Sequence, residues 1–120
     1  MKIQESGEMY LETILILKRK IANVRAIDVA QEMNFSKPSV SRALGILKDN
    51  LYITVDKNGY IAMTEKGLLV AEKIYERHNV LTCFFKSLGV PEDLAQTDAC
   101  KVEHDISDET FSAIKTFLSK

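Results

Sequence analysis

The chain has 120 residues, 46% hydrophobic and 28% charged, with a net charge of −1, and these values exclude disordered, collagen-like and coiled-coil proteins. No apolar run approaches the roughly 20 residues that span a bilayer, and no secretory signal is visible at the amino terminus. Two distant cysteines, at positions 83 and 100, suit a reducing compartment, so we expect a small cytoplasmic protein without a membrane partner.

Three helices and a tight turn are predicted over the first fifty residues. Apolar side chains recur at helical spacing over residues 7–21, 25–33 and 36–50. The turn at residues 34–36 is short, and Ser36 has the residue type that caps the amino terminus of a helix. Two short helices joined in this way, the second opened by small polar residues, are typical of a helix-turn-helix.

A hairpin is predicted next. Residues 51–55 and 60–63 are strand-like and flank an Asn-Gly pair, which is the strongest short hairpin signal. Three helices followed by a hairpin describe a winged helix. We therefore predict a winged helix-turn-helix DNA-binding domain over residues 1–63.

The remainder of the chain is predicted to be helical. A helix over residues 65–88 is longer than a winged helix needs for its own core, so its extra apolar width is expected to pack against another subunit or an added subdomain. Further helices are expected over residues 92–105, interrupted near Thr97, and after Ser107. The fold class is therefore mainly α, with an all-α domain over residues 64–120.

The surface predicted to read DNA opens the second helix of the helix-turn-helix, the helix that enters the major groove. Residues 1–62 carry nine basic and seven acidic side chains, an excess that suits phosphates but that an ordinary solvated surface also shows. Arg42 can make a bidentate contact to guanine, whereas Ser36 and Pro38 also serve to cap and start the helix. The predicted DNA-binding residues are Ser36, Lys37, Pro38, Ser39, Arg42 and, at the hairpin tip, Lys57.

A second constellation surrounds Cys100. If this segment is helical, Cys100, Glu103 and His104 share one helix face. A thiolate, a carboxylate and an imidazole on one face form a partial coordination sphere for a divalent transition metal. The alternative is an inert buried cysteine beside a solvated Glu-His pair, and these residues alone do not decide between the two. No HExxH motif, phosphate loop or nucleophile–base pair accompanies them, so we do not expect an enzyme.

Several stretches match one family in order and spacing along essentially the whole chain. They are residues 8–11 (EMYL), 36–42 (SKPSVSR), 77–78 (RH), 99–104 (ACKVEH) and 107–109 (SDE). On these residues the chain resembles the iron- and manganese-dependent transcriptional repressors of the diphtheria toxin repressor (DtxR/MntR) family. The resemblance implies a winged helix followed by a helical metal-binding and dimerisation domain. It also implies a homodimer that binds double-stranded operator DNA when loaded with Fe²⁺ or Mn²⁺, without an organic cofactor.

The resemblance further implies the ligands of a regulatory metal. The positions that match the Met, Cys, Glu and His of iron-type members are Met9, Cys100, Glu103 and His104. Manganese-type members carry carboxylates in place of the first two. Sulfur donors shift preference away from Mn²⁺ and toward Fe²⁺, Co²⁺, Ni²⁺ or Zn²⁺, so we expect Fe²⁺ in the cell and accept the other three as substitutes in vitro. A purely apolar core role is the alternative for Met9.

A second metal site is implied less directly. His78 matches a family ligand in the long helix, but Thr82 and Gln96 stand where iron-type members have a Glu and a His. Glu12 matches a ligand of manganese-type members instead, so Glu12, His78 and Glu103 form a candidate hybrid site. The alternative for His78 is a structural histidine. The chain is expected to be a short form without the SH3-like third domain of longer relatives.

A mechanism follows from the wide spacing of these ligands along the chain. A metal that joins the first helix to the distal trio would fix the separation of two recognition helices in a dimer, which must match half-sites about 34 Å apart. Metal and DNA would then bind cooperatively. Two rivals remain at this stage: a manganese sensor of the same family, and a metal-independent winged-helix regulator of the MarR type.

Overall fold

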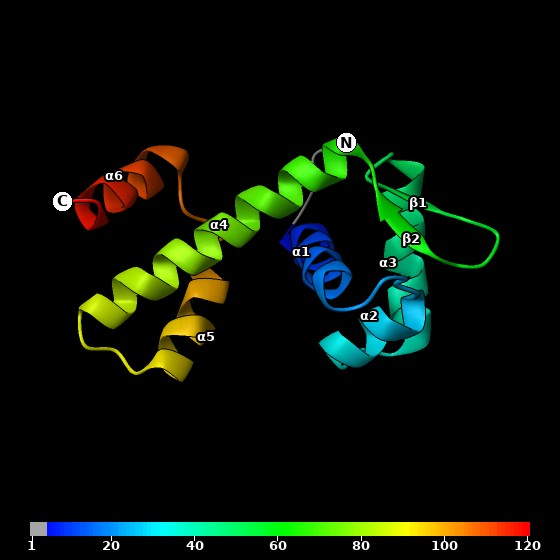
Figure 1. Cartoon of the computed structure of the whole chain (residues 1–120), viewed down its shortest axis with the longest axis horizontal. Coiled ribbons are helices and arrows are strands. Elements are labelled where there is room, and N and C mark those ends of the chain that lie inside the picture. Colours follow the sequence, from blue (N-terminus) through cyan, green and yellow to red (C-terminus); the bar gives the residue numbers. More distant parts are fainter. Residues whose placement is uncertain (1–4) are drawn as a thin grey trace. The chain divides into compact units, whose positions relative to one another are not determined.

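The computed structural model describes residues 5–120 and confirms a mainly helical fold with one hairpin after the third helix (Figure 1). The chain forms two compact units, the first ending at Glu72 and the second spanning Lys73–Lys120, with the division inside a long helix. Within the described range, every helix is too short or too polar to span a bilayer. The elements are α1 (Glu5–Lys20), α2 (Ala26–Met33), α3 (Lys37–Asp49), β1 (Ile53–Val55), β2 (Ile61–Met63), α4 (Glu65–Ser87), α5 (Glu92–Val102) and α6 (Asp108–Leu118).

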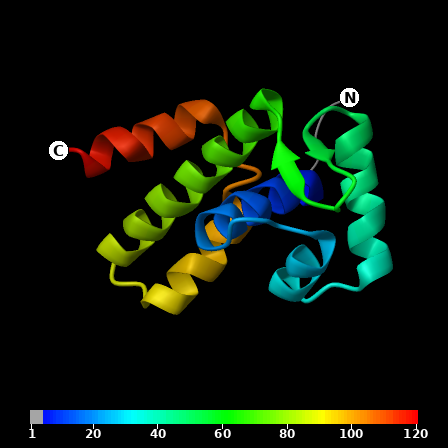
Figure 2. The same cartoon turned by 45° about the vertical axis from the view of Figure 1, so that its right-hand side comes forward.

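The first unit is a winged helix. α2 packs against α1 and α3, and β1 follows α3 and pairs with β2 in an antiparallel hairpin (Figure 2). Apolar side chains from all five of these elements are buried, among them Ile14, Val29, Val40, Leu44, Ile53 and Ile61. Burial of this apolar surface, rather than the propensity of each short helix, holds the unit together.

The turn between α2 and α3 has the predicted form. Asn34 adopts the left-handed conformation with φ 57°, which asparagine tolerates better than most residues. Ser36 then caps α3, because its Oγ accepts a hydrogen bond from the N–H of Ser39 at 3.3 Å. Pro38 lies in the first turn of α3, where the lack of an N–H costs little. These local features expose the amino-terminal turn of α3 to solvent.

The hairpin strands are shorter than predicted, and the first begins two residues late. Leu51 adopts φ 66° just after α3, and the N–H of Tyr52 donates to the carbonyl of Leu47 at 2.9 Å. These two residues therefore complete the carboxyl end of α3 instead of extending the strand. The register pairs Ile53 with Met63.

The start of α4 is tied to the hairpin. Thr64 caps the helix, since its Oγ1 accepts the N–H of Gly67 at 3.1 Å. A Cβ atom at Gly67 would lie 2.0 Å from the backbone oxygen of Tyr52, so only glycine allows this close approach of the two backbones.

The second unit consists of the carboxyl-terminal part of α4 with α5 and α6, which lie on opposite sides of it (Figures 1 and 2). The predicted interruption of α5 near Thr97 is wrong. The Oγ1 of Thr97 donates to the carbonyl of Asp93 at 3.0 Å, a bond one helical turn back that leaves the helix continuous. Ser107 caps α6 by accepting the N–H of Thr110 at 3.1 Å.

Candidate functional site

The candidate nucleic-acid surface lies on the first unit. All six residues predicted to contact DNA are exposed: Ser36, Lys37, Pro38, Ser39, Arg42 and Lys57. The first five open α3, and Lys57 lies at the tip of the hairpin. Asp56 fixes that tip, because its Oδ1 accepts the N–H of Asn58 and of Tyr60 at 2.9 Å each. The fold therefore presents the reading helix and the wing to solvent in the same unit.

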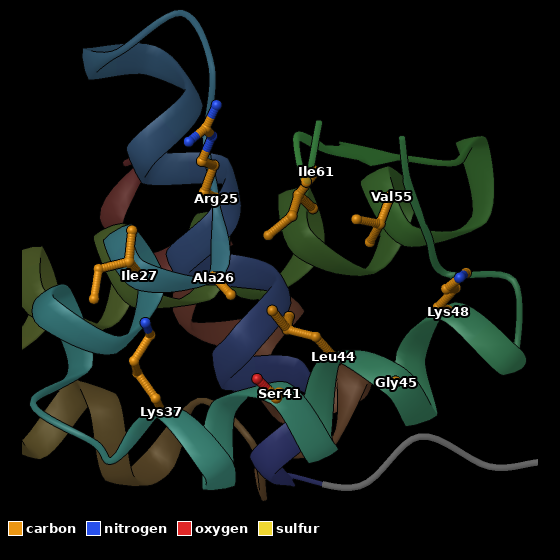
Figure 3. Close-up of a pocket in the computed structure, with 11 residues that line it drawn as sticks. Arg25, Ala26, Ile27, Lys37, Ser41, Leu44, Gly45, Lys48, Val55 and Ile61 are labelled. Carbon is orange, nitrogen blue, oxygen red and sulfur yellow. The ribbon is translucent and has the colours of Figure 1, made fainter. Parts of the chain in front are cut away.

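A groove of about 430 Å³ runs between α3, the start of α2 and the hairpin (Figure 3). Leu44 from α3 and Ile61 from β2 lie on its apolar floor, whereas Arg25, Lys37 and Lys48 lie toward its periphery. The residues that line it include no acidic side chain. A groove with an apolar floor and a cationic rim suits a nucleic-acid strand. The sugars of the strand would lie against the floor, and its phosphates would lie near the basic side chains at the rim.

Two of these rim cations were absent from the sequence-based set of DNA-binding residues. Arg25 supports the wing directly, since its guanidinium lies 4.7 Å from the centre of the Tyr60 ring and its Nη2 donates to the Tyr60 hydroxyl at 3.2 Å. Lys48 lies three turns along α3 from Lys37, on the side that lines the groove. Their basic charge was visible in the sequence, but only the path of the hairpin shows that they share one groove.

Two of the predicted metal ligands belong to α1. Met9 is half-buried and lines a small cavity of about 240 Å³ within the first unit, beside Met33 and Phe35. An apolar packing role accounts for these contacts of Met9. Glu12, one turn later, is 8% exposed and is one of the few buried charged side chains among the described residues.

The second unit holds a buried carboxylate between two imidazoles. Glu103 is fully buried, at 0% exposure. Its Oε2 lies 3.0 Å from Nδ1 of His78, and its Oε1 lies 3.4 Å from Nε2 of His104, whose side chain is 1% exposed. The two histidines come from α4 and from the turn after α5. His78 and His104, which the sequence assigned to two different metal sites, therefore share one carboxylate.

This arrangement fits a divalent cation. Among the described residues, no donor makes a hydrogen bond to Glu103 Oε1, although the oxygen has less than 1 Å² of accessible surface. Its ion-pair contact is Nε2 of His104 at 3.4 Å, and a buried carboxylate is stable only with cationic or hydrogen-bonding partners of this kind. Carboxylate oxygen and imidazole nitrogen are common ligands of Fe²⁺, Mn²⁺ and Zn²⁺. The donors present in this unit therefore suit the metal that the sequence pattern implies.

The geometry around Cys100 differs in part from the prediction of one continuous helix face. α5 ends at Val102, Glu103 is its C-cap, and His104 lies in the turn beyond it. Glu103 keeps helical dihedral angles, and its N–H still donates to the carbonyl of Ala99 at 2.9 Å. Cys100 is half-buried on α5, one turn before Glu103. The helical spacing thus holds from Cys100 to Glu103 and ends there.

The turn that carries Glu103 and His104 is held by a buried arginine. Arg77 is 6% exposed, and its Nη1 donates to the backbone carbonyls of Glu103 at 3.0 Å and of Ile106 at 2.8 Å. Its Nη2 donates to Asp108 at the start of α6. Lys73, followed by Arg77, holds the pKa of the Asp108 carboxyl below its usual range by hydrogen bonding and charge. In the sequence, Arg77 was noted only because the Arg77-His78 pair is one of the stretches on which the family resemblance rests.

Comparisons with known proteins decide the family. Residues 2–67 match the family described as "Iron dependent repressor, N-terminal DNA binding domain". Residues 64–120 match "Iron dependent repressor, metal binding and dimerisation domain". The chain belongs to the iron-dependent repressor family. This family consists of metal-dependent, DNA-binding transcriptional repressors, and the predicted resemblance is confirmed.

Several relatives are similar to this chain over most of its length. An HTH-type transcriptional regulator of Methanocaldococcus jannaschii is 32% identical over 120 residues, covering 98% of this chain and 96% of its own. The transcriptional regulator MntR of Escherichia coli O6:H1 is 32% identical over 111 residues, covering 92% of this chain and 72% of its own. The structure of the manganese regulator SloR matches with a TM-score of 0.84 and 26% identity over 99% of this chain. The chain covers 55% of SloR and so spans about half of that structure.

Proposed function

We propose that the protein is a transcriptional repressor of the cytoplasm that binds double-stranded operator DNA as a homodimer when it is loaded with Fe²⁺. One observation carries the proposal: the chain combines an exposed winged helix with a fully buried carboxylate that faces an imidazole on each side. A buried carboxylate that faces two imidazoles brings together oxygen and nitrogen donors of the kind that bind divalent transition metals.

The proposed ligands of the regulatory metal are Met9, Cys100, Glu103 and His104, and those of a second site are Glu12 and His78 together with Glu103. When bound, a divalent cation supplies the positive charge that the buried carboxylate needs and coordination bonds to donors of both units. Glu103 and His104 contribute hard oxygen and borderline nitrogen, and Met9 and Cys100 contribute soft sulfur. The family description supports a metal site in residues 64–120, which match a metal binding and dimerisation domain.

Sulfur donors favour Fe²⁺ over Mn²⁺ as the physiological metal. The second candidate is Mn²⁺, and it is favoured by the similarity to the transcriptional regulator MntR and the manganese regulator SloR. Zn²⁺, Co²⁺ and Ni²⁺ are expected to substitute in vitro, because imidazole and thiolate bind the later metals well. The sulfur donors of Met9 and Cys100 are therefore the feature that favours Fe²⁺ over Mn²⁺.

The proposed division of labour places DNA binding in residues 1–63 and metal binding and dimerisation in residues 64–120. Exposed groups at the start of α3, with the wing lysine Lys57, supply the DNA contacts. Because ligands are proposed on both α1 and the second unit, metal binding and operator binding are linked. Each then strengthens the other by the same factor, with a coupling of typically 1–3 kcal/mol, about 5- to 150-fold.

The test is operator binding by the full chain, measured by fluorescence anisotropy at one fixed salt concentration. Operator DNA is first selected from a random pool with metal-loaded protein. We expect chelator to weaken binding 5- to 150-fold, and anaerobic Fe²⁺ to restore it at lower concentration than Mn²⁺. Equal binding with and without metal would establish the metal-independent rival instead. Recovery with Mn²⁺ but not with Fe²⁺ would favour the manganese candidate.

A double variant tests the ligands. Cys100→Ser with Glu103→Ala should bind operator equally well with and without metal, at the weak metal-free level. Lys115→Gln is the matched control, since it removes a charge and an exposed ion pair with Glu76 in the same unit. The control should keep the full response to metal. A double variant that still responds to metal would contradict the proposed ligand set.

A further inference from the structure

Arg77 makes an unusual set of contacts for a buried cation. Its guanidinium donates to two backbone carbonyls, those of Glu103 and Ile106, and to the carboxylate of Asp108. The guanidinium carbon also lies 5.6 Å from the centre of the Phe111 ring in α6. One side chain of α4 therefore holds both ends of the turn that links α5 to α6.

Arg77 and its neighbour in sequence hold Glu103 at two different points. The Arg77 guanidinium binds the backbone oxygen of Glu103, whereas Nδ1 of His78 lies 3.0 Å from the side-chain Oε2. A residue whose main chain and side chain are both fixed has little freedom to rotate. Fixing the main chain at Glu103 also limits the position of the next residue, His104.

We propose that Arg77 is a positioning residue for the metal-binding carboxylate, which it aims between the two imidazoles by holding the backbone of the α5–α6 turn. The inference rests on the proposed function only in taking Glu103 to be a metal ligand. Arg77 itself binds no metal, because a guanidinium has no acceptor. Outer-shell groups that orient ligands typically account for 10- to 100-fold in metal affinity.

The contacts explain why this position needs arginine. A planar fork reaches several acceptors in fixed directions and packs its face on an aromatic ring, which a flexible ammonium does not reproduce. The two carbonyls that it binds are 26 and 29 residues away along the chain, both just beyond the carboxyl end of α5. Backbone carbonyls that are shielded from water need a hydrogen-bond partner, so Arg77 stabilises these two as well as placing them.

The same side chain connects the metal ligands to α6. Asp108 is the first residue of α6 and follows its cap, Ser107. If the Glu103 backbone shifts, the Arg77 guanidinium that binds it must shift too, and this guanidinium also binds Asp108. The connection extends the effect of metal binding from the turn to a helix of the domain described as the dimerisation domain.

The test measures Co²⁺ binding by the full chain for wild type, Arg77→Lys, Arg77→Gln and the control Lys115→Gln. We expect both Arg77 variants to bind Co²⁺ 10- to 100-fold more weakly, with lysine failing to rescue. At saturating Co²⁺ their visible absorption bands should also differ from wild type, because the ligands are differently placed. Circular dichroism reports whether each variant is folded. The control should match wild type in affinity and spectrum.

A second measurement needs no metal. In the metal-free protein, the imidazole ¹⁵N signals of His78 should shift in both Arg77 variants and stay fixed in Lys115→Gln. If an Arg77 variant fails to fold, Asp108→Asn takes its place, since it leaves the arginine but releases one of its partners, and it should shift the same signals less. Folded Arg77 variants with wild-type Co²⁺ affinity, Co²⁺ spectrum and His78 signals would overturn the proposal. A wild-type protein whose operator binding ignores metal would overturn the proposed function alone.

Discussion

The two candidate functional regions of this member of the iron-dependent repressor family are built in opposite ways. The DNA-facing residues of α3 and the wing are exposed, and Lys37, Arg42 and Lys57 extend into solvent. Glu103 in the second unit has no exposed surface and faces a histidine on each side. DNA binding by the first region depends on which charged side chains reach solvent. Metal binding by the second region depends on how precisely the Glu103 carboxylate and the two imidazoles are positioned.

This difference decides how each region should respond to change. Charges exposed to water are screened over about 8 Å at physiological ionic strength, and a neighbouring cation can partly replace a lost one. A buried metal ligand such as Glu103 has no such replacement, because water does not reach the site and cannot bind in place of the lost side chain. Single changes should therefore weaken the DNA surface by degrees and disable the buried site at once.

The largest effect is expected for Glu103→Gln, which keeps the size of the side chain and removes its charge. Because even outer-shell changes cost 10- to 100-fold in metal affinity, loss of the ligand charge itself should raise the dissociation constant of Fe²⁺ or Mn²⁺ by more than about 100-fold. Isothermal titration calorimetry of the metal measures this. Glu109→Gln removes an exposed carboxylate from the first turn of α6 and serves as the control. Equal affinity in the two variants would show that Glu103 is not a ligand.

A smaller effect on a different quantity is expected for Arg42→Ala. If Arg42 reads a guanine, its loss should reduce the preference for operator over random DNA by about 1–3 kcal/mol, roughly 5- to 150-fold, with metal affinity unchanged. The ratio of the two DNA dissociation constants measures this preference. Lys20→Ala removes an exposed charge from the last turn of α1, outside the predicted DNA-binding set, and should leave the ratio unchanged. A lower metal affinity in Arg42→Ala would show that the DNA surface and the metal site do not respond independently to substitution.

The groove cations should act mainly through charge. Lys48→Gln should weaken binding to all DNA sequences alike and reduce the slope of log affinity against log salt by about 1. Lys101→Gln removes an exposed charge from α5 and tests whether net charge alone matters. If the salt slope changes equally in both variants, Lys48 acts only through net charge, and its groove does not contact DNA.

The same contrast explains what could be predicted from the sequence. The helices of the winged helix follow from apolar spacing, and the cap Ser36 and the Asn58-Gly59 turn are local signals. The residue types of Cys100, Glu103 and His104 indicate a candidate metal site by their chemistry, and the assignment of these residues as ligands stays a prediction. The exposed residues of α3 could be named because helix geometry alone determines which face is left outside.

Other features depend on contacts that no local pattern encodes. The link from Arg77 to the carbonyls of Glu103 and Ile106 requires the path of the turn after α5. The groove joins Arg25 to Lys48 only because the hairpin folds back beside α3. The predicted interruption near Thr97 failed for a related reason, since a threonine hydroxyl can bond within a helix as well as break one.

The smallest effect is expected at the exposed end of the Arg77 network. Hydrogen bonds and charge from Lys73, then from Arg77, lower the pKa of Asp108 below its usual value of 3.8. A carboxyl whose pKa is lower in the folded than in the unfolded chain stabilises the fold at pH values above the unfolded pKa. That stabilisation is lost as the pH falls through the folded pKa.

Asp108→Asn should therefore be less stable than wild type at neutral pH, and the difference should disappear at pH values below the folded pKa of Asp108. Urea unfolding of the metal-free protein at a series of pH values from neutral to strongly acidic measures this. The difference should be small and should shrink with added salt, because the Asp108 side chain is 68% exposed. A large, salt-independent difference would mean that Asp108 behaves like the buried Glu103 nearby, and the sharp distinction between exposed and buried charge in this protein would not hold.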